Sequence, residues 1–121
     1  MTIIDTNDTI CAMATPAGGA IGIVRISGTN AIDIANSLFA PKNKLANARP
    51  SSLSYGRILD AQGQEIYDVL VSVFHAPHSY TGENSVEISC HGSRYVMTEI
   101  LKALILSGCR QAEPGEFTKR A

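Results

Sequence analysis

Three strand-like stretches follow one another in the middle of the chain, with the sequences LSYGRIL (53–59), IYDVLVSVF (66–74) and SVEISC (85–90). In the second and third, apolar and polar residues alternate, which is typical of strands that bury one face. A Gln62-Gly63 pair between the first two favours a tight turn. No helical segment separates the three stretches. We therefore expect them to lie side by side in one sheet, and not in a regular alternation of strand and helix.

The apolar spacing on either side of this region predicts two helices and additional strands. Apolar residues recur at three- and four-residue steps over 31–39 and over 93–107, and Pro41 and Gly108 mark where these helices end. Strands are predicted at 9–13 and 21–27, with a short one near 109–112. Residues 41–52 are loop-like, with little to pack. The sequence thus predicts an α+β fold, a mixed sheet with two or three helices.

The composition indicates one ordinary domain over residues 1–121. A chain of 121 residues, 45% of them hydrophobic, can bury a core without disulfides or metal. Ten Lys and Arg against eleven Asp and Glu argue against free-standing nucleic-acid binding, which favours a basic surplus. Three widely spaced cysteines indicate reduced thiols, and there is neither a basic leader nor an apolar run of about 18 residues. We expect a cytoplasmic protein without membrane association.

The glycine-rich segment ATPAGGAIG (14–22) is a candidate ligand loop, because Gly18 and Gly19 would let a ligand approach the backbone. No Lys-Ser or Lys-Thr follows, and the segment leads into a strand instead of a helix, so a nucleotide-phosphate loop is disfavoured. A turn between two strands is the simpler interpretation. Adjacent Cys90 and His91 point to opposite faces of a strand, so no metal site is expected. No catalytic relay can be assigned.

Arg25, Glu87 and Tyr80 each allow a structural and a functional interpretation. Arg25 interrupts an apolar strand, where it either forms a structural ion pair or clamps an anion or carbonyl. Glu87 lies with serines on the polar side of its strand, which favours a solvated or edge position. As a ligand contact it would accept two parallel hydrogen bonds from an amidine-like edge, such as that of a pterin or an arginine. Tyr80 either packs its loop against the sheet or stacks on a ligand.

The last residues, PGEFTKRA (114–121), have the pattern of a turn followed by the first turn of a new helix. We expect that a following helical domain begins at about residue 117 and is cut short there.

Six strings in this order carry a family resemblance: DTI (8–10), ATP (14–16), IGIVRISG (21–28), SYTGE (79–83), HG (91–92) and PGEF (114–117). Together they closely resemble the N-terminal domain of the bacterial tRNA-modification GTPase family MnmE, also called TrmE. The likeness runs from Asp8 to the end of the chain.

The resemblance implies a fold similar to the tetrahydrofolate-binding domain of aminomethyltransferases, with 5-formyl-tetrahydrofolate or a related folate bound and a homodimer formed through this domain. It further implies that the whole protein carries a GTPase domain with GTP, Mg and K, outside this chain. With a flavin-dependent partner protein, members of the family modify C5 of the wobble uridine of tRNA, and the folate is the one-carbon donor. No catalytic activity is expected of this chain alone.

Carried over residue by residue, the family's folate-contacting arginine falls on Arg25 and its folate-contacting glutamate on Glu87. Tyr80, Gly18 and Gly19 are weaker candidates. The glycine loop is one residue shorter than the family's common PPGxGG form, which puts backbone contacts from these glycines in question. Two alternatives remain: a purely structural dimerisation domain without productive folate binding, and a free-standing nucleotide-binding enzyme. The absent lysine after the glycines counts against the second.

Overall fold

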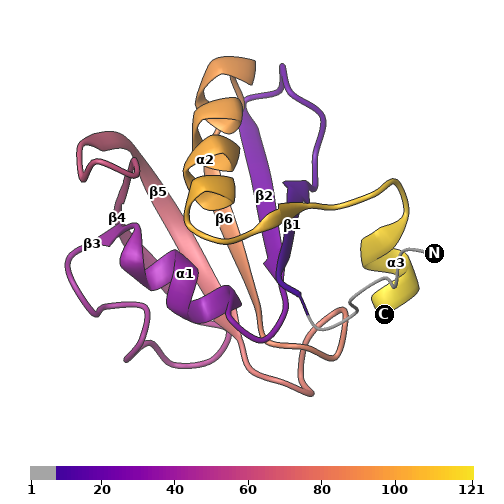
Figure 1. The fold of residues 1–121 in the computed structure, drawn as a ribbon. Coiled ribbons are helices and arrows are strands. Elements are labelled where there is room, and N and C mark those ends of the chain that lie inside the picture. Colours follow the sequence, from indigo (N-terminus) through magenta and orange to yellow (C-terminus); the bar gives the residue numbers. More distant parts are fainter. Residues whose placement is uncertain (1–7) are drawn as a thin grey trace.

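The computed structural model describes residues 8–121, which form a seven-stranded mixed sheet in the order β3-β4-β5-β6-β2-β1-β7 (Figure 1). Neighbouring strands are antiparallel, except that β1 and β7 are parallel. The strands are β1 (Ile10–Met13), β2 (Ile21–Ser27), β3 (Phe39–Ala40), β4 (Leu53–Leu59), β5 (Glu65–Phe74), β6 (Ser85–His91) and β7 (Arg110–Gln111). The predicted α+β class with a mixed sheet is confirmed, and the three central stretches are neighbours as expected.

The two longer helices, α1 (Ala31–Ser37) and α2 (Arg94–Leu106), lie on the same face of the sheet (Figure 1). The Ser93 hydroxyl caps α2 by accepting a 3.0 Å hydrogen bond from the Val96 N–H. Met97 of α2 packs so closely on β2 that a side chain at Gly22 would overlap its thioether. Gly22 therefore sets how near α2 lies to the sheet.

Phe39 is not part of the first helix, so the predicted helix over 31–39 is too long. The helix ends at Ser37, and Phe39 pairs with Ile58 in a short edge strand. Its ring lies over Gly56, where any side chain would collide with Phe39 and with the Ala40 carbonyl. The space left by Gly56 on the neighbouring strand lets Phe39 reach the core from β3, and helical periodicity alone could not show this.

We expected the side chains of residues 41–52 to make few packing contacts. Leu45 contradicts this expectation. Leu45 is 1% exposed and belongs to the main apolar cluster. Ala48 is partly buried against the same cluster. The loop thus contributes two side chains to the core.

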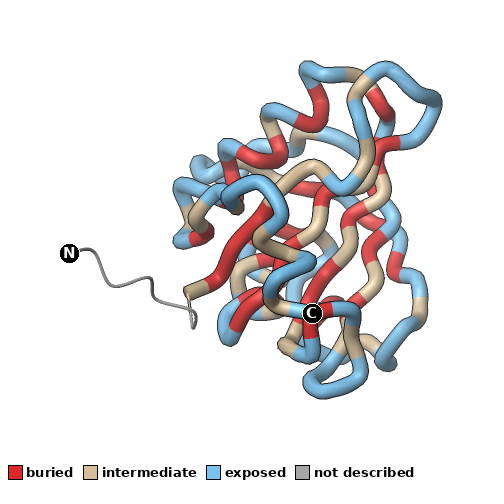
Figure 2. Tube along the Cα trace, turned by 90° about the vertical axis from the view of Figure 1, so that its right-hand side faces the viewer, coloured by how far each residue is buried: buried red, intermediate tan, exposed pale blue. Residues whose placement is uncertain are grey.

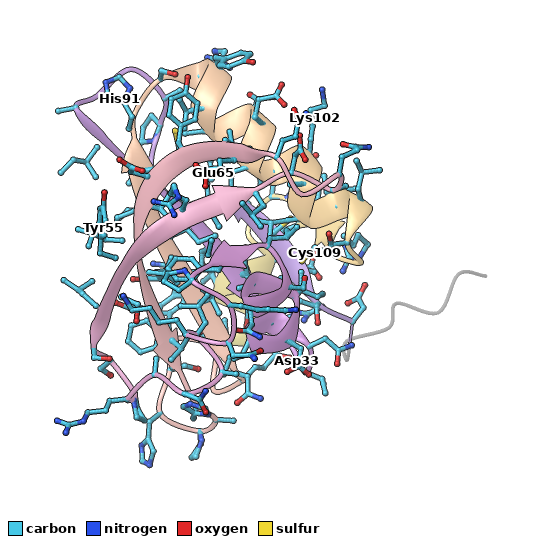
Figure 3. All side chains as sticks on the ribbon, turned by 90° about the vertical axis from the view of Figure 1, so that its left-hand side faces the viewer. Asp33, Tyr55, Glu65, His91, Lys102 and Cys109 are labelled. Atoms are coloured by element: carbon cyan, nitrogen blue, oxygen red, sulfur yellow. The ribbon has the colours of Figure 1, made fainter. Side chains whose placement is uncertain are left out.

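Opposite the helices, the second face of the sheet is covered at one end only. Residues 75–84 and α3 (Glu116–Arg120) contact this face at Arg25 and Ser27. The rest, called here the open face, carries four side chains exposed by 41–67%: Ile21, Leu53, Tyr55 and Leu70. The alternation of buried and less buried residues along the strands is visible in Figure 2, and Figure 3 shows Tyr55 on the side away from α2, which carries Lys102.

Candidate ligand-binding site

Arg25 and Glu87 face each other on the two central strands of the sheet. They are partners in the β2–β6 register, and the Arg25 Nε and Nη2 atoms lie 2.9 Å and 2.8 Å from Oε2 of Glu87. Their side chains are 27% and 31% exposed. The edge position favoured for Glu87 is wrong, because β6 is flanked by β5 and β2. Of the two interpretations of Arg25, the structure shows the ion pair.

Two aromatic rings lie against the Arg25 guanidinium. Its Cζ is 5.2 Å from the ring centre of Tyr80 and 5.9 Å from that of Phe117, within the range of cation–π attraction. Tyr80 itself is 55% exposed, so it has a free surface as well as a packing role. Phe117 was not predicted as a site residue. The sequence signals near it were the Pro-Gly turn that precedes it and its place in the PGEF (114–117) string.

The geometry at Glu87 suits a planar ligand that donates two hydrogen bonds. Both contacts from Arg25 converge on Oε2, and no donor among residues 8–121 is hydrogen-bonded to Oε1. A carboxylate can accept two parallel bonds through its two oxygens, so a ligand edge could take Oε1 and replace Arg25 at Oε2. Arg25 would then be free to meet an anionic or carbonyl group.

A polar network lies beside this pair on the same face. The Ser27 hydroxyl is 2.6 Å from Thr81 Oγ1 and donates to Glu83 Oε1 at 2.8 Å. Glu83 in turn contacts Arg120 of α3 at 3.4 Å. Ser27 is only two residues from Arg25, so the network begins next to the candidate site.

Beyond Glu83, the network joins α3 to the start of β1 and to β7. Arg120 pairs with Asp8 at 2.6 Å and with Glu116 at 3.1 Å, and Arg110 pairs with both carboxylates. The hydrogen bond from Arg110 is the main reason that the pKa of Glu116 falls to about 2. The same arginine lowers the pKa of Asp8 against the opposing effect of desolvation. Both carboxylates are therefore charged at neutral pH.

Gly18 and Gly19 lie away from the group formed by Arg25, Glu87 and Tyr80. The Gly18 N–H donates to the Gly92 carbonyl at 2.8 Å, which fixes the loop on the end of β6. The last β2–β6 pair is Ile21 with His91, four residues from Arg25, or about 13 Å along a strand. The two glycines lie in the turn between β1 and β2, and their role as ligand contacts stays a prediction.

An open concavity of about 340 Å³ lies beside this loop on the open face. Its lining includes the exposed Ile21, Tyr55 and Leu70 together with Asp68 and His91. A hydrogen bond with Asp68 raises the pKa of Tyr55. Sequence reasoning missed this surface, because exposed and buried apolar residues look alike in a strand pattern.

Residues 8–121 contain neither a disulfide nor a cluster of metal ligands. Cys11, Cys90 and Cys109 are buried free thiols. In this part of the chain no three His, Cys, Asp or Glu side chains gather as metal ligands. No helix found there has the length and apolar character needed to cross a membrane.

Comparison with known protein families shows to which family the chain belongs. The family described as "GTP-binding protein TrmE N-terminus" matches residues 9–121. The chain belongs to this family. Membership confirms the resemblance inferred from the six strings.

Several curated relatives, each named tRNA modification GTPase MnmE, are longer than this chain. The chain is 52% identical over 118 residues to the one from Bacteroides thetaiotaomicron, and also 52% identical over 118 residues to the one from Christiangramia forsetii. Identity to the Porphyromonas gingivalis protein is 48% over 118 residues. The alignments cover 94–95% of this chain but 25% of each relative. The chain thus spans about a quarter of the length of these relatives.

Proposed function

We propose that this chain is the folate-binding and self-associating portion of a tRNA-modifying GTPase. The observation that carries the proposal is the Arg25–Glu87 pair, half-buried at the centre of the sheet and lined by Tyr80 and Phe117. This arrangement combines a carboxylate, a cation and aromatic surfaces within one small region. These are the groups that a folate requires.

A folate matches the site in three respects. The 2-amino and ring N–H edge of its pterin is a planar donor pair for Glu87. The pterin ring can stack on Tyr80, which is exposed. The 4-oxo group of the pterin adjoins that edge, and a carbonyl oxygen there suits the guanidinium of Arg25, which lies 2.8 Å from Glu87. We propose 5-formyl-tetrahydrofolate or a related folate as the ligand, which would serve as one-carbon donor in the whole protein.

Self-association is proposed through the open face. Ile21 of β2, Leu53 and Tyr55 of β4, and Leu70 of β5 are large apolar side chains that remain 41–67% exposed, and three of them line one concavity. Contiguous apolar surface of this kind is typical of interfaces. A homodimer would bury it. The matched test is sedimentation of Leu70→Ser beside Leu106→Ser, an exposed leucine on α2. We expect only the first to weaken a dimer, and a wild-type chain that stays monomeric at micromolar concentration would contradict the proposal.

The remaining family properties are proposed for the whole protein. GTP, Mg and K would bind in a GTPase domain outside this chain, and a flavin-dependent partner protein would act with it on C5 of the wobble uridine of tRNA. The reaction would take place in the cytoplasm. We further propose that residues from about 117 onward begin a helical domain, which is consistent with the helical conformation of α3.

Calorimetric titration with 5-formyl-tetrahydrofolate tests the folate site. We expect binding to weaken by about tenfold or more in Glu87→Gln, because a charge-assisted hydrogen bond contributes about 1.5–3 kcal/mol. Glu65→Gln is a matched control, since Glu65 is also a strand glutamate paired with an arginine, Arg57, at 2.9 Å. Absence of binding by the wild-type chain, with a dimer still present, would favour the purely structural alternative.

A further inference from the structure

Arg120 is a buried cation that the proposed binding chemistry does not use. Its side chain is 7% exposed, although it lies in α3, a helix of five residues. Lys119 beside it is exposed. Burying a guanidinium is costly unless its donors are paired. The contacts that Arg120 makes therefore identify what it holds together.

The guanidinium of Arg120 joins three segments that are distant in sequence. It donates to the Asp8 carbonyl at 2.7 Å and to the Asp8 carboxylate at 2.6 Å. It lies 3.4 Å from each carboxylate oxygen of Glu83. Within α3 it contacts Glu116 at 3.1 Å. Arg120 thereby links α3 to the start of β1 and to the turn over residues 79–84.

Glu83 extends this link to the strand that carries Arg25. Its Oε1 accepts from the Ser27 hydroxyl at 2.8 Å, and its carbonyl accepts from the Ser79 hydroxyl. Its N–H donates to Thr81 Oγ1 at 3.3 Å. The 79–84 turn is thus fixed on both sides of Tyr80, and it is attached to β2 on the face that Arg25 shares.

The two rings beside Arg25 lie on the two segments that Glu83 and Arg120 join. Tyr80 belongs to the turn and Phe117 to α3, and the Tyr80 hydroxyl is 3.4 Å from Thr118 Oγ1. A five-residue helix is not stable by itself in water. The position of Phe117 therefore depends on contacts that α3 makes with the rest of the chain, and Arg120 is the most buried of its charged side chains.

We propose that Glu83 and Arg120 are positioning residues of the candidate ligand site: their contact fastens the 79–84 turn to α3 and so holds Tyr80 and Phe117 against Arg25. Neither residue touches the ligand in this arrangement. The expected effect of Glu83 and Arg120 on ligand affinity rests on the proposed folate function. Their expected effect on the positions of the Tyr80 and Phe117 rings does not. The two can therefore be tested separately.

The ligand-free test is nuclear magnetic resonance of the Arg25 Nε–H signal, assigned through its loss in Arg25→Lys. Aromatic rings near a proton displace its signal. In Arg120→Gln we expect the Arg25 signal to move toward the value of a solvent-exposed arginine, while signals of α2 stay in place. Lys119→Gln removes the same charge from the same helix and should leave Arg25 unchanged. Glu83→Gln, which retains the shape of the side chain, provides a second variant should Arg120→Gln fold poorly.

The ligand-dependent test is titration of the same variants with 5-formyl-tetrahydrofolate. We expect about tenfold weaker binding for Arg120→Gln and Glu83→Gln, unchanged binding for Lys119→Gln, and partial recovery in Arg120→Lys, which keeps the charge. An Arg25 signal and an affinity that match the wild type in both variants would overturn the proposal. A wild-type chain that binds no folate, with the Arg25 signal still displaced in Arg120→Gln, would uphold the positioning role and reject the folate.

Discussion

The Arg25–Glu87 pair should contribute little to the stability of the fold, and a double-mutant cycle measures this directly. At the observed 2.8 Å, the gross attraction is about 1.5 kcal/mol in water and about 6 kcal/mol at an effective dielectric of 20. Desolvation and side-chain ordering offset most of it, because the side chains are 27% and 31% exposed. We expect a coupling free energy of about 1 kcal/mol between Arg25→Met and Glu87→Gln.

Urea denaturation followed by circular dichroism gives the free energy of unfolding of the wild type, the two single variants and the double variant. The same cycle at Arg57 and Glu65 is the control. These side chains are 44% and 57% exposed, and their coupling should stay below about 0.5 kcal/mol. A coupling above about 3 kcal/mol at Arg25–Glu87, typical of breaking a buried pair, would refute the reasoning. The main contribution of the pair would then be to the stability of the fold, and the case for its role in ligand binding would fall.

Three other predictions concern stability. Leu45→Ala should lower the free energy of unfolding in urea by about 2–4 kcal/mol, because Leu45 is 1% exposed; a loss below about 1 kcal/mol would mean that the loop does not contribute to the core. The folded-state pKa of Glu116 is about 2 against 4.5 for the free carboxyl, so its stabilisation is present above about pH 4.5 and is lost as the pH falls toward 2. Glu116→Gln should flatten that part of a pH titration of stability, and an unchanged slope would contradict the assignment. Gly92→Ala should lower the melting temperature, because its new side chain would collide with the Gly19 backbone, whereas Gly19→Ala, which meets no atom closer than 3.8 Å, should melt close to the wild type.

Local patterns predicted the secondary structure well where one strand or helix could be read by itself. The strands at 53–59 and 21–27 have the predicted bounds, because strand propensity is a local property of the residues. Phe39 and Leu45 were misjudged, since the burial of Phe39 depends on Gly56 of another strand and Leu45 joins a cluster built from segments distant in sequence. Such contacts between distant segments leave no periodic signal in the sequence.

In the candidate site, too, local chemistry could be predicted from the sequence and contacts between distant segments could not. The chemistry of Arg25 and Glu87 was visible in their strands, but their pairing joins residues 62 positions apart. Phe117 and Arg120 were not foreseen as part of the site, because their roles arise only when α3 folds back on β2 and on the 79–84 turn. Sequence reasoning identified side chains with unusual chemistry in ordinary strands. The fold was needed to show which of them meet.

The Arg25–Glu87 contact also has a consequence for how affinity should be measured. A ligand that reaches Glu87 exchanges one planar donor for another, since the protein's own guanidinium already occupies Oε2. At Oε2 the gain is then only a difference between two similar contacts, so the new hydrogen bond at Oε1 and ring stacking must supply most of the net binding free energy. For the same reason free guanidinium ion is a competitor for Glu87. Guanidinium chloride would therefore perturb this pair as well as the fold, and urea is the better denaturant for stability measurements that concern it.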